Sequence, residues 1–306
     1  MIVAGAAMLM LVLSTATGIA YVWQPPEDRD YQSRYLTTVE SRYADTDLAR
    51  FHYTKTGTGP AVVLVAGGGQ WLYSYRDTIP VLAQHFTVYA VDLPGQGYTT
   101  LKQRDFRYDL DAMSGALGTF LDAMALPKAS LVGHSWGGAT SLYFAERHPE
   151  RVTRLALLAS PGLDVPSSWD WRPLEVPVLG ELIGKLMTKS NSEATQRKSF
   201  VHQDRVTPEL IDENWAQMSR PDNREALWSQ QRNFDYALTE RLLGEVGAPT
   251  LVVWGGADRF DEPWQAAELA RRIPRATSQV FEGCGHSVHE DCADQVNPAL
   301  LSFLTV

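Results

Sequence analysis

A serine, an aspartate and a histidine each follow closely on a short apolar run of the chain. Ser135 lies within Gly-His-Ser-Trp-Gly, Asp258 ends the sequence Gly-Gly-Ala-Asp, and His286 ends Gly-Cys-Gly-His. A serine hydroxyl is a weak nucleophile unless a histidine takes its proton and a carboxylate orients that histidine. These residue types, in the order Ser, Asp, His and each just after an expected strand, predict a catalytic triad for acyl transfer.

The residues around Ser135 suit a sharp turn from a strand into a helix. Gly133 and Gly137 leave room for neighbouring backbone, and such a turn pushes the serine hydroxyl out at the edge of the sheet. A helix that begins at Trp136 would direct its first N–H groups and its positive end toward an oxyanion formed there. The pattern indicates a nucleophilic serine rather than an incidental serine in a glycine-rich turn.

Short apolar runs alternate with amphipathic stretches over most of the chain. The apolar runs are typical of strands buried on both faces, and we expect such strands at 61–65, 87–91, 129–132, 155–159, 250–253 and 277–281. The amphipathic stretches predict helices at 108–125, 137–147, 264–272 and 294–304. This alternation predicts an α/β fold with a doubly wound, mostly parallel sheet, whose strands end where the triad residues begin.

Two parts of the chain depart from this alternation. The alternating residues of 34–40 and 49–54 predict two antiparallel strands at one edge of the sheet. The interval 162–234 has no strand-like run and carries tryptophans and leucines at loosely helical spacings. We therefore expect an inserted helical cap over the carboxyl edge of the sheet, within one domain that spans 34–306.

The composition is that of one sizeable globular domain. The chain has 306 residues, of which 44% are hydrophobic, and 27 Lys plus Arg against 36 Asp plus Glu leave a net charge of -9. This balance argues against a nucleic-acid partner, because phosphate binding needs a basic face. The two cysteines are too few for a disulfide scaffold.

Residues 1–26 carry no charged side chain and are mostly apolar. A run of this length can cross a bilayer, and Tyr21 and Trp23 lie where interfacial aromatic residues belong. A cleaved signal peptide is the alternative, although no Lys or Arg precedes the apolar stretch, and a buried core helix is a third interpretation. We expect membrane association through this segment, or export if it is cleaved.

Taken together, these motifs resemble those of the α/β-hydrolase family over nearly all of residues 34–306. The matching segments are the glycine-rich sequence at 63–68, Asp-Leu-Pro-Gly-Gln-Gly at 92–97, the turn at Ser135, the loop that ends at Asp258 and the Gly-His pair at His286. The resemblance implies that Ser135 is the nucleophile and that His286 acts as general base and then as acid. It also implies that Asp258 orients and stabilises His286.

The resemblance further implies how an oxyanion is bound. The backbone N–H groups of Trp136 and Gly68 would form the oxyanion hole, with Gly69 as a substitute for Gly68, and no metal or organic cofactor is required. The serine also excludes the dehalogenases and epoxide hydrolases of this fold, which use aspartate. Ala66 and Gln96 stand where family members usually carry histidine, which leaves the shape of the oxyanion loop open.

Other residues offer alternative roles in the same site. Asp164 or Asp261 could act as the acid of the triad, and His289 could act as its base. Glu290 is expected to support the site or to start a helix rather than to catalyse.

A cluster of thiols and imidazoles allows a different interpretation. Cys284, His286, His289 and Cys292 lie within nine residues and could bind zinc tetrahedrally. Zinc would consume the base that Ser135 needs, and the cysteine spacing fits no usual zinc finger. A disulfide between Cys284 and Cys292 is the alternative if the domain is exported.

We expect a serine hydrolase that cleaves a carboxylic ester or related acyl bond of a small to medium apolar substrate. The aromatic cap favours an apolar acyl or alcohol group. A C–C bond hydrolase of the meta-cleavage type uses the same triad and is the alternative within the enzyme class. A membrane-tethered binding protein that has lost turnover, and an acyltransferase, are further alternatives.

Overall fold

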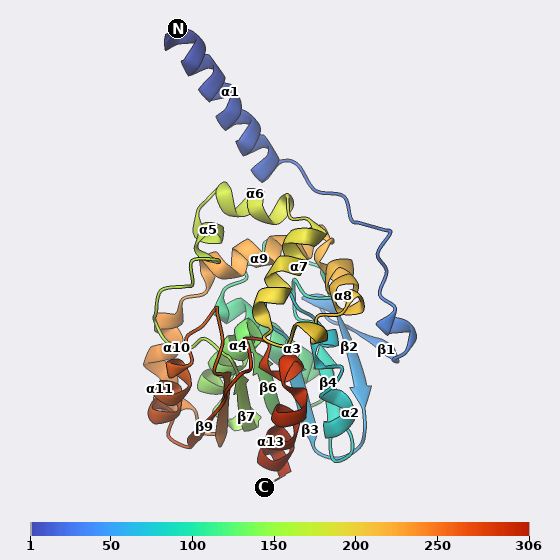
Figure 1. The fold of residues 1–306 in the computed structure, drawn as a ribbon. Coiled ribbons are helices and arrows are strands. Elements are labelled where there is room, and N and C mark those ends of the chain that lie inside the picture. Colours follow the sequence, from blue (N-terminus) through green and yellow to red (C-terminus); the bar gives the residue numbers. More distant parts are fainter. Residues whose placement is uncertain (1, 306) are drawn as a thin grey trace.

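The computed structural model describes residues 2–305, with side chains from residue 12 onward. Its centre is a nine-stranded sheet in the order β1-β2-β4-β3-β6-β7-β8-β9, with β5 paired to β2 (Figure 1). The pairs that involve β2 are antiparallel and all the others are parallel. The strands are β1 (Ser41–Asp45), β2 (Ala49–Thr56), β3 (Ala61–Val65), β4 (Thr87–Val91), β5 (Thr100–Leu101), β6 (Ala129–His134), β7 (Val152–Leu158), β8 (Thr250–Gly255) and β9 (Ala276–Phe281).

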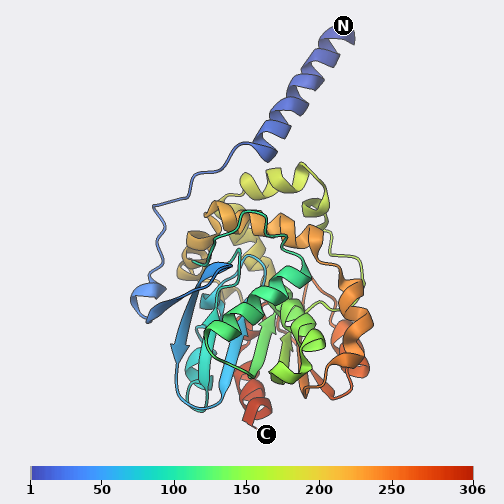
Figure 2. The same ribbon diagram turned by 180° about the vertical axis from the view of Figure 1, so that it is seen from behind.

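Helices cover both faces of this sheet, as Figures 1 and 2 show from opposite sides. The apolar residues of α3, α4 and α11 belong to one buried core, and those of α2 and α13 belong to the other. The helices are α1 (Ile2–Tyr21), α2 (Ile79–Leu82), α3 (Leu110–Ala123), α4 (Ser135–Arg147), α5 (Arg172–Glu175), α6 (Leu179–Lys185), α7 (Lys189–Ser199), α8 (Pro208–Met218), α9 (Pro221–Asn233), α10 (Tyr236–Leu242), α11 (Trp264–Arg272), α12 (Val288–Asp291) and α13 (Ala293–Thr305). The fold is therefore the doubly wound α/β arrangement that the sequence predicts.

The central strands show why continuous apolar runs mark this fold. In β3, Val63 and Val65 pack into one core, whereas Val62 and Leu64 pack into the other. Successive side chains of a strand point to opposite faces, so a strand covered on both sides must be apolar at every position.

The last strand of the sheet differs from its prediction. The run at 277–281 is a strand, but it is not buried on both faces: Thr277, Ser278, Gln279 and Val280 are exposed. β9 pairs only with β8, so it is an edge strand with one side open to solvent.

The strand predicted at 34–40 is wrong. Tyr35–Thr37 forms a 3-10 helix, and the antiparallel edge strand β1 begins only at Ser41. The backbone N–H groups of Arg34 and Tyr35 both donate to Oε1 of Glu213, at 2.7 and 2.9 Å. This contact with α8 draws the chain away from the sheet.

The segment between β7 and β8 carries helices α5 to α9, which lie above the sheet in Figure 1. We call these five helices the cap helices. Side chains of α7, α8 and α9 line a common cavity with residues that follow β6, β8 and β9. The carboxyl ends of the parallel strands thus meet the cap helices, where ligands of open α/β sheets bind.

Helix α1 projects away from the rest of the molecule, beside α6 (Figure 1). The expected anchor or signal segment at 1–26 falls partly on residue 1 and the side chains of 2–11, which lie outside the described residues. Among the residues that the structure does describe, no helix combines the length and the apolar character needed to cross a membrane.

Candidate active site

Ser135 is the first residue of α4 and directly follows β6. Its φ of 49° lies in the left-handed region, which a side chain other than glycine adopts only under constraint. The turn also needs glycine at 137, where a Cβ would lie 2.2 Å from the carbonyl oxygen of Ala66. The strand-to-helix turn therefore holds the serine at the floor of the cavity beneath the cap helices.

The side chains of Ser135, His286 and Asp258 form one hydrogen-bonded row. His286 Nε2 lies 3.0 Å from Ser135 Oγ, and His286 Nδ1 lies 2.7 Å from Asp258 Oδ2. The other carboxylate oxygen of Asp258 accepts N–H groups of Phe260 and Asp261 at 2.8 and 3.0 Å. Asp258 therefore accepts a hydrogen bond from the Nδ1–H group of His286, which leaves the Nε2 lone pair directed at the serine hydroxyl.

The charges around His286 prepare it to accept a proton. Burial by itself lowers the pKa of His286, but the attraction of Asp258 and Asp261 outweighs burial and raises the pKa above its ordinary value. Burial tends to raise the pKa of Asp258, whereas the imidazole of His286 and two backbone N–H groups hold that pKa below its usual range. Asp258 is therefore a carboxylate that can stabilise an imidazolium at His286.

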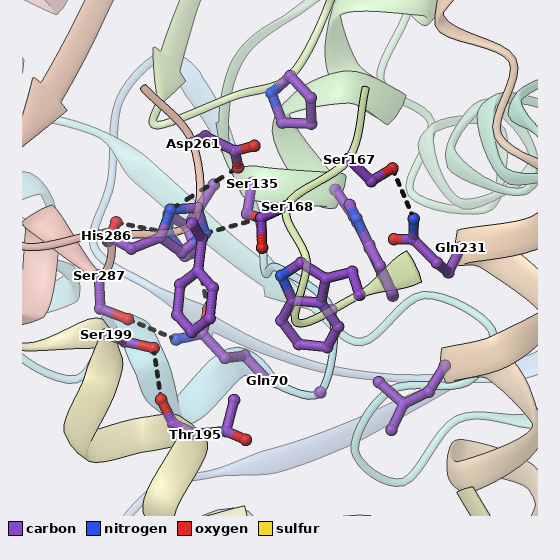
Figure 3. A pocket seen from close by; sticks show the side chains of 18 of the residues that line it. Gln70, Ser135, Ser167, Ser168, Thr195, Ser199, Gln231, Asp261, His286 and Ser287 are labelled. Atoms are coloured by element: carbon purple, nitrogen blue, oxygen red, sulfur yellow. Dashed lines mark hydrogen bonds and ion pairs between the residues drawn. The ribbon is translucent and has the colours of Figure 1, made fainter. Parts of the chain in front are cut away.

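Asp261 is a second carboxyl beside the imidazole (Figure 3). Its Oδ2 lies 3.9 Å from His286 Nδ1, compared with 2.7 Å for Asp258. Burial raises the pKa of Asp261 to about 6. Geometry thus places Asp258 in the orienting position and Asp261 at the edge of the same group, where it adds negative charge.

The other candidates lie in different surroundings. Asp164 is exposed, and its backbone N–H donates to Glu240 at 2.6 Å. His289 is fully buried, neither of its ring nitrogens has a partner among the described residues, and burial lowers its pKa far below the usual range. Glu290 pairs with Arg76. None of these three residues faces the serine hydroxyl through a hydrogen bond.

The two sulfurs of the thiol and imidazole cluster are joined. Cys284 and Cys292 form a disulfide across eight positions, with Cα atoms 6.0 Å apart. The bond closes the loop that contains His286, and the oxidised sulfurs are not the thiolates that a zinc site uses.

The glycine-rich loop after β3 approaches the serine closely. Gly68 and Gly69 line the cavity together with Ser135 and Trp136. A Cβ on Gly68 would lie 2.1 Å from the Trp136 ring, so only glycine fits there. The backbone of this loop therefore borders the cavity next to Ser135 and Trp136.

The side chain of Gln96 braces the glycine-rich loop after β3. Its side-chain amide donates to the carbonyl groups of Ala66 and Gly67 at 2.8 and 3.2 Å, and its Oε1 accepts the N–H of Leu93 at 3.1 Å. From the sequence, Gln96 is notable only because it stands where members of the family usually carry histidine. The structure shows that this side chain connects the loop at 92–97 to the oxyanion loop.

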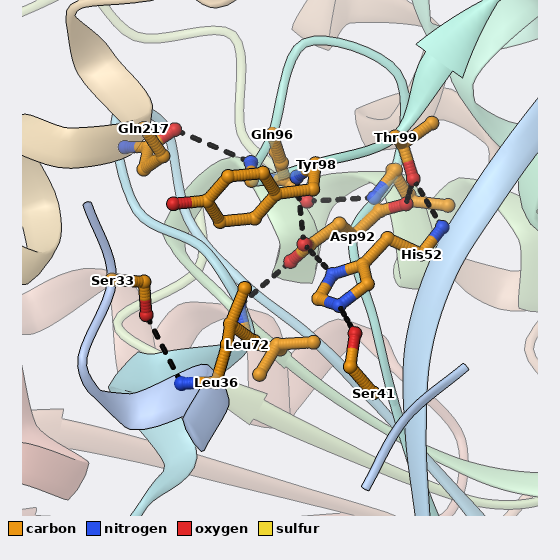
Figure 4. Close-up of polar contacts among 12 residues, drawn as sticks. Ser33, Leu36, Ser41, His52, Leu72, Asp92, Gln96, Tyr98, Thr99 and Gln217 are labelled. Atoms are coloured by element: carbon orange, nitrogen blue, oxygen red, sulfur yellow. Dashed lines mark hydrogen bonds and ion pairs between the residues drawn. The ribbon is translucent and has the colours of Figure 1, made fainter. Parts of the chain in front are cut away.

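A buried network around Asp92 in turn holds the loop that carries Gln96 (Figure 4). Asp92 accepts from His52 Nδ1 at 2.6 Å, from the N–H of Leu72 at 2.8 Å and from that of Tyr98 at 3.1 Å. His52 Nε2 lies 2.6 Å from Ser41 Oγ. These three side chains repeat the residue types of the triad, but none of them lines the cavity at Ser135.

His134 and Gln70 form a second support that the sequence does not reveal. His134 Nε2 lies 3.0 Å from the backbone carbonyl oxygen of His286, and its Nδ1 lies 2.7 Å from Gln70 Oε1; both oxygens are acceptors, so a neutral ring donates to one of them at a time. Burial lowers the pKa of His134 to about 3, so the ring is neutral. Gln70 also donates to Glu290 at 2.9 Å. Adjacency of Gln70 to the glycine-rich loop is the one sequence signal that could have indicated it.

Aromatic and uncharged polar side chains line the cavity, which has a free volume of about 110 Å³. The ring centroids of Trp136 and Trp171 are 5.7 Å apart, those of Trp171 and Phe260 are 5.5 Å apart, and those of Phe260 and His286 are 5.3 Å apart. Uncharged polar side chains of α7 and α8 also line the cavity. No lysine or arginine is among the described residues that line it.

Comparison with known proteins bears on the fold and on the reaction class. Residues 60–292 match the family model described as "alpha/beta hydrolase fold". The chain is 31% identical to a 2-hydroxy-6-oxo-6-phenylhexa-2,4-dienoate hydrolase of Comamonas testosteroni over 281 residues, which cover 88% of this chain and 96% of that protein.

Two solved structures share the fold. A mutant of CumD, a meta-cleavage product hydrolase from Pseudomonas fluorescens IP01, aligns with a TM-score of 0.76 at 24% identity and covers 86% of this chain and 97% of its own. The carboxylesterase CesB from Bacillus subtilis aligns with a TM-score of 0.74 at 18% identity and covers 95% of each chain. C–C bond hydrolases and an esterase therefore have the same architecture as this chain.

Proposed function

Because this chain belongs to the α/β-hydrolase family and is a hydrolase, we propose that it cleaves an acyl bond through a covalent acyl-enzyme on Ser135. The observation that carries the proposal is the hydrogen-bonded row Ser135–His286–Asp258, with distances of 3.0 and 2.7 Å, at the floor of a cavity. These distances put each group within hydrogen-bond reach of the next, which supports nucleophilic catalysis by Ser135.

The reaction proceeds in two halves. Ser135 Oγ attacks the substrate carbonyl carbon while His286 Nε2 takes the hydroxyl proton, and the N–H groups of Trp136 and Gly68 receive the oxyanion. The tetrahedral adduct collapses, and His286 returns the proton to the leaving group. A water molecule then loses its proton to His286 and attacks the acyl carbon, which releases the acid and restores Ser135.

The relatives bear on the bond that is cleaved. The Comamonas testosteroni protein, 31% identical to this chain, is named for a dienoate whose cleaved bond joins two carbons. This supports a C–C bond hydrolase of the meta-cleavage type better than the ester hydrolase that the sequence favours. A carboxylic ester stays the second candidate because the described lining of the cavity is partly aromatic and contains no lysine or arginine.

Labelling by a fluorophosphonate probe tests the nucleophile. We expect the wild-type protein to be labelled, and Ser135→Ala and His286→Ala to lose the label. Ser41→Ala is the matched control. Ser41 contacts His52, which in turn contacts Asp92, but Ser41 does not line the cavity. Equal labelling of Ser135→Ala and wild type would refute the proposal, and an unlabelled, folded wild type would favour a binding protein.

Product analysis then separates the substrates. Untreated wild-type enzyme, from a preparation that the probe labels, is offered 2-hydroxy-6-oxo-6-phenylhexa-2,4-dienoate and a series of neutral esters that differ in acyl length. Turnover of the dienoate with inertness toward esters identifies a C–C hydrolase, and the reverse identifies an esterase. Product that appears as a new ester when an alcohol is added would indicate acyl transfer.

We further propose that the segment 1–26 associates the protein with a membrane, or leads to its export when cleaved. The proposal rests on the uncharged, apolar sequence alone. Fractionation of the full chain and of a chain that starts at residue 27 tests it. Recovery of both chains wholly in the soluble fraction would refute membrane association.

A further inference from the structure

We infer that the outer face of α6 is a docking surface for a lipid bilayer, so that the cap helices rest on a membrane beside α1. The inference rests on the membrane association proposed for the segment 1–26 and names a further part of the contact. Its basis is the distribution of side chains on α6 (Leu179–Lys185), which is the reverse of what a surface helix of a globular protein shows.

Helix α6 exposes apolar side chains and buries its charged ones. Leu179, Ile183 and Leu186 are 44%, 37% and 54% exposed, and their spacing places them on one side of the helix and its end. Glu181 and Lys185, by contrast, are only 5% and 4% exposed. Water therefore meets the apolar side of this helix, and an exposed apolar patch of this kind marks a site of interaction.

The buried charges have partners that hold this orientation. Oε1 of Glu181 accepts from Nη1 of Arg232 at 2.7 Å, and Nζ of Lys185 donates to the backbone carbonyl of Trp23 at 2.7 Å. A rotation of α6 that buried its apolar side would break both contacts. The outward direction of the apolar face is therefore set by the fold.

The apolar surface continues beyond α6. Residues 176–187 contain two charged side chains, and both are the buried ones of α6. Leu186 lines an open groove together with Ile19 and Val22, at the end of α1, and Figure 1 shows α1 beside α6. The segment 1–26 carries no charged side chain. Uncharged, apolar side chains therefore follow one another from α1 onto the cap helices.

The lack of charge favours a lipid bilayer as the partner of this surface. A protein interface surrounds its apolar centre with polar groups and carries about ten hydrogen bonds. Helix α6 and the described side chains of α1 present no exposed charged group to such a partner. Tyr21 and Trp23, both exposed at the end of α1, are the residue types that lie at the headgroup level of membranes. A helix that lies in this interface needs one apolar side and does not have to span the bilayer.

Docking through α6 would bring the cover of the cavity to the lipid. Trp171 directly precedes α5 and Met187 closely follows α6, and both line the cavity that contains Ser135. The C-terminal end of α13 lies at the opposite end of the molecule from α1, as Figures 1 and 2 show. We therefore expect α6 in the lipid and the end of α13 in water.

Spin labels report which part of the bound protein lies in lipid. The two cysteines of the chain are joined in a disulfide, so a cysteine introduced by Ile183→Cys can be labelled alone. Ser302→Cys, at an exposed position of α13, is the matched control. Each full-length protein is mixed with phosphatidylcholine vesicles, and the bound fraction is collected by flotation. Collisions of the nitroxide with oxygen and with the anion chromium oxalate are then measured.

The ratio of oxygen collisions to chromium oxalate collisions locates each label. At residue 183 we expect vesicle binding to raise this ratio at least about tenfold, because lipid dissolves apolar oxygen and excludes an anion. At residue 302 the ratio should stay unchanged. Adding Leu179→Gln and Leu186→Gln to the labelled Ile183→Cys protein should remove most of the rise. Leu186→Gln alone is the second variant in case the pair does not fold, and it should reduce the rise.

The outcomes of the spin-label experiment are distinct. Vesicle-bound protein whose label at residue 183 stays in water would overturn docking through α6 and leave the membrane association of 1–26 intact. Coupling between labels at residue 183 in the absence of vesicles would show that a second copy covers this face, which would also overturn the inference. A folded full-length protein that does not float with vesicles would overturn both the membrane association and the docking.

Discussion

Replacing Asp258 by asparagine tests the proposed mechanism most directly. Asp258 Oδ2 lies 2.7 Å from His286 Nδ1, while Oδ1 is held by two backbone N–H groups at 2.8 and 3.0 Å. An asparagine keeps Oδ1 on those two donors, and its NH₂ group therefore faces Nδ1. Nδ1 must then accept a hydrogen bond, and the imidazole proton moves to Nε2. Because Nε2 lies 3.0 Å from Ser135 Oγ, the protonated nitrogen can no longer take the serine proton.

The size of the effect follows from this change of tautomer. Loss of the correct tautomer in a serine triad lowers kcat by about 10⁴-fold, and each tenfold step corresponds to about 1.4 kcal/mol of transition-state free energy. We expect Asp258→Asn to lose about 10³- to 10⁴-fold in the rate of fluorophosphonate labelling, or about 4–5.5 kcal/mol. The fold should be retained, because both backbone donors to Oδ1 keep their acceptor.

Asp261→Asn is the matched control. Its Oδ2 is 3.9 Å from His286 Nδ1 and does not decide the tautomer, so we expect a loss of less than about tenfold. Labelling rates are measured by stopped reactions on intact protein, with thermal unfolding to confirm that each variant is folded. If Asp261→Asn lost a thousandfold while Asp258→Asn stayed within tenfold of wild type, the assignment of the orienting acid would be wrong.

Three further perturbations have defined expectations. Asp261→Asn removes a negative charge that raises the pKa of His286, so the acid limb of a kcat/KM profile should move to lower pH; an unchanged limb would contradict this. Replacing Cys284 and Cys292 by serine opens a loop with a separation of 8 residues and should reduce the free energy of unfolding in urea by about 2.5 kcal/mol, whereas an unchanged midpoint would deny the bond a stabilising role. Burial raises the pKa of Glu146 from 4.5 to about 9, and its carboxyl has no partner among the described residues. The folded state therefore holds this proton more tightly, stability falls as pH rises between those values, and Glu146→Gln should raise Tm by more at about pH 8 than at about pH 5.

Local sequence patterns were enough to predict the parallel sheet and the positions at which the candidate triad residues follow its strands. The strands expected at 61–65 and 87–91 agree with β3 and β4 to the residue, because a strand covered on both faces must be apolar at every position. Glycine-rich turns follow the apolar runs at 129–132, 250–253 and 277–281. These turns indicated where Ser135, Asp258 and His286 lie at the edge of the sheet. These signals are local, since they depend on the composition of short segments and on the space that glycine leaves.

The errors concern segments whose surroundings come from elsewhere in the chain. The expected strand at 34–40 is a 3-10 helix because Glu213, far away in sequence, accepts its backbone N–H groups. The run at 277–281 was expected to be buried, yet β9 has a neighbour on one side only. Periodicity predicts a strand but does not reveal its position within the sheet.

The candidates for one role, and the side chains that support them, could be distinguished only in the folded chain. Asp258 and Asp261 are three positions apart and chemically equal, and only their distances to His286 Nδ1 distinguish them. Gln96 braces the glycine-rich loop after β3 through contacts with Ala66 and Gly67, which are distant along the chain. Hydrogen bonds depend on the distance and direction between two groups, and for groups on separate elements both are set by the packing of the whole fold.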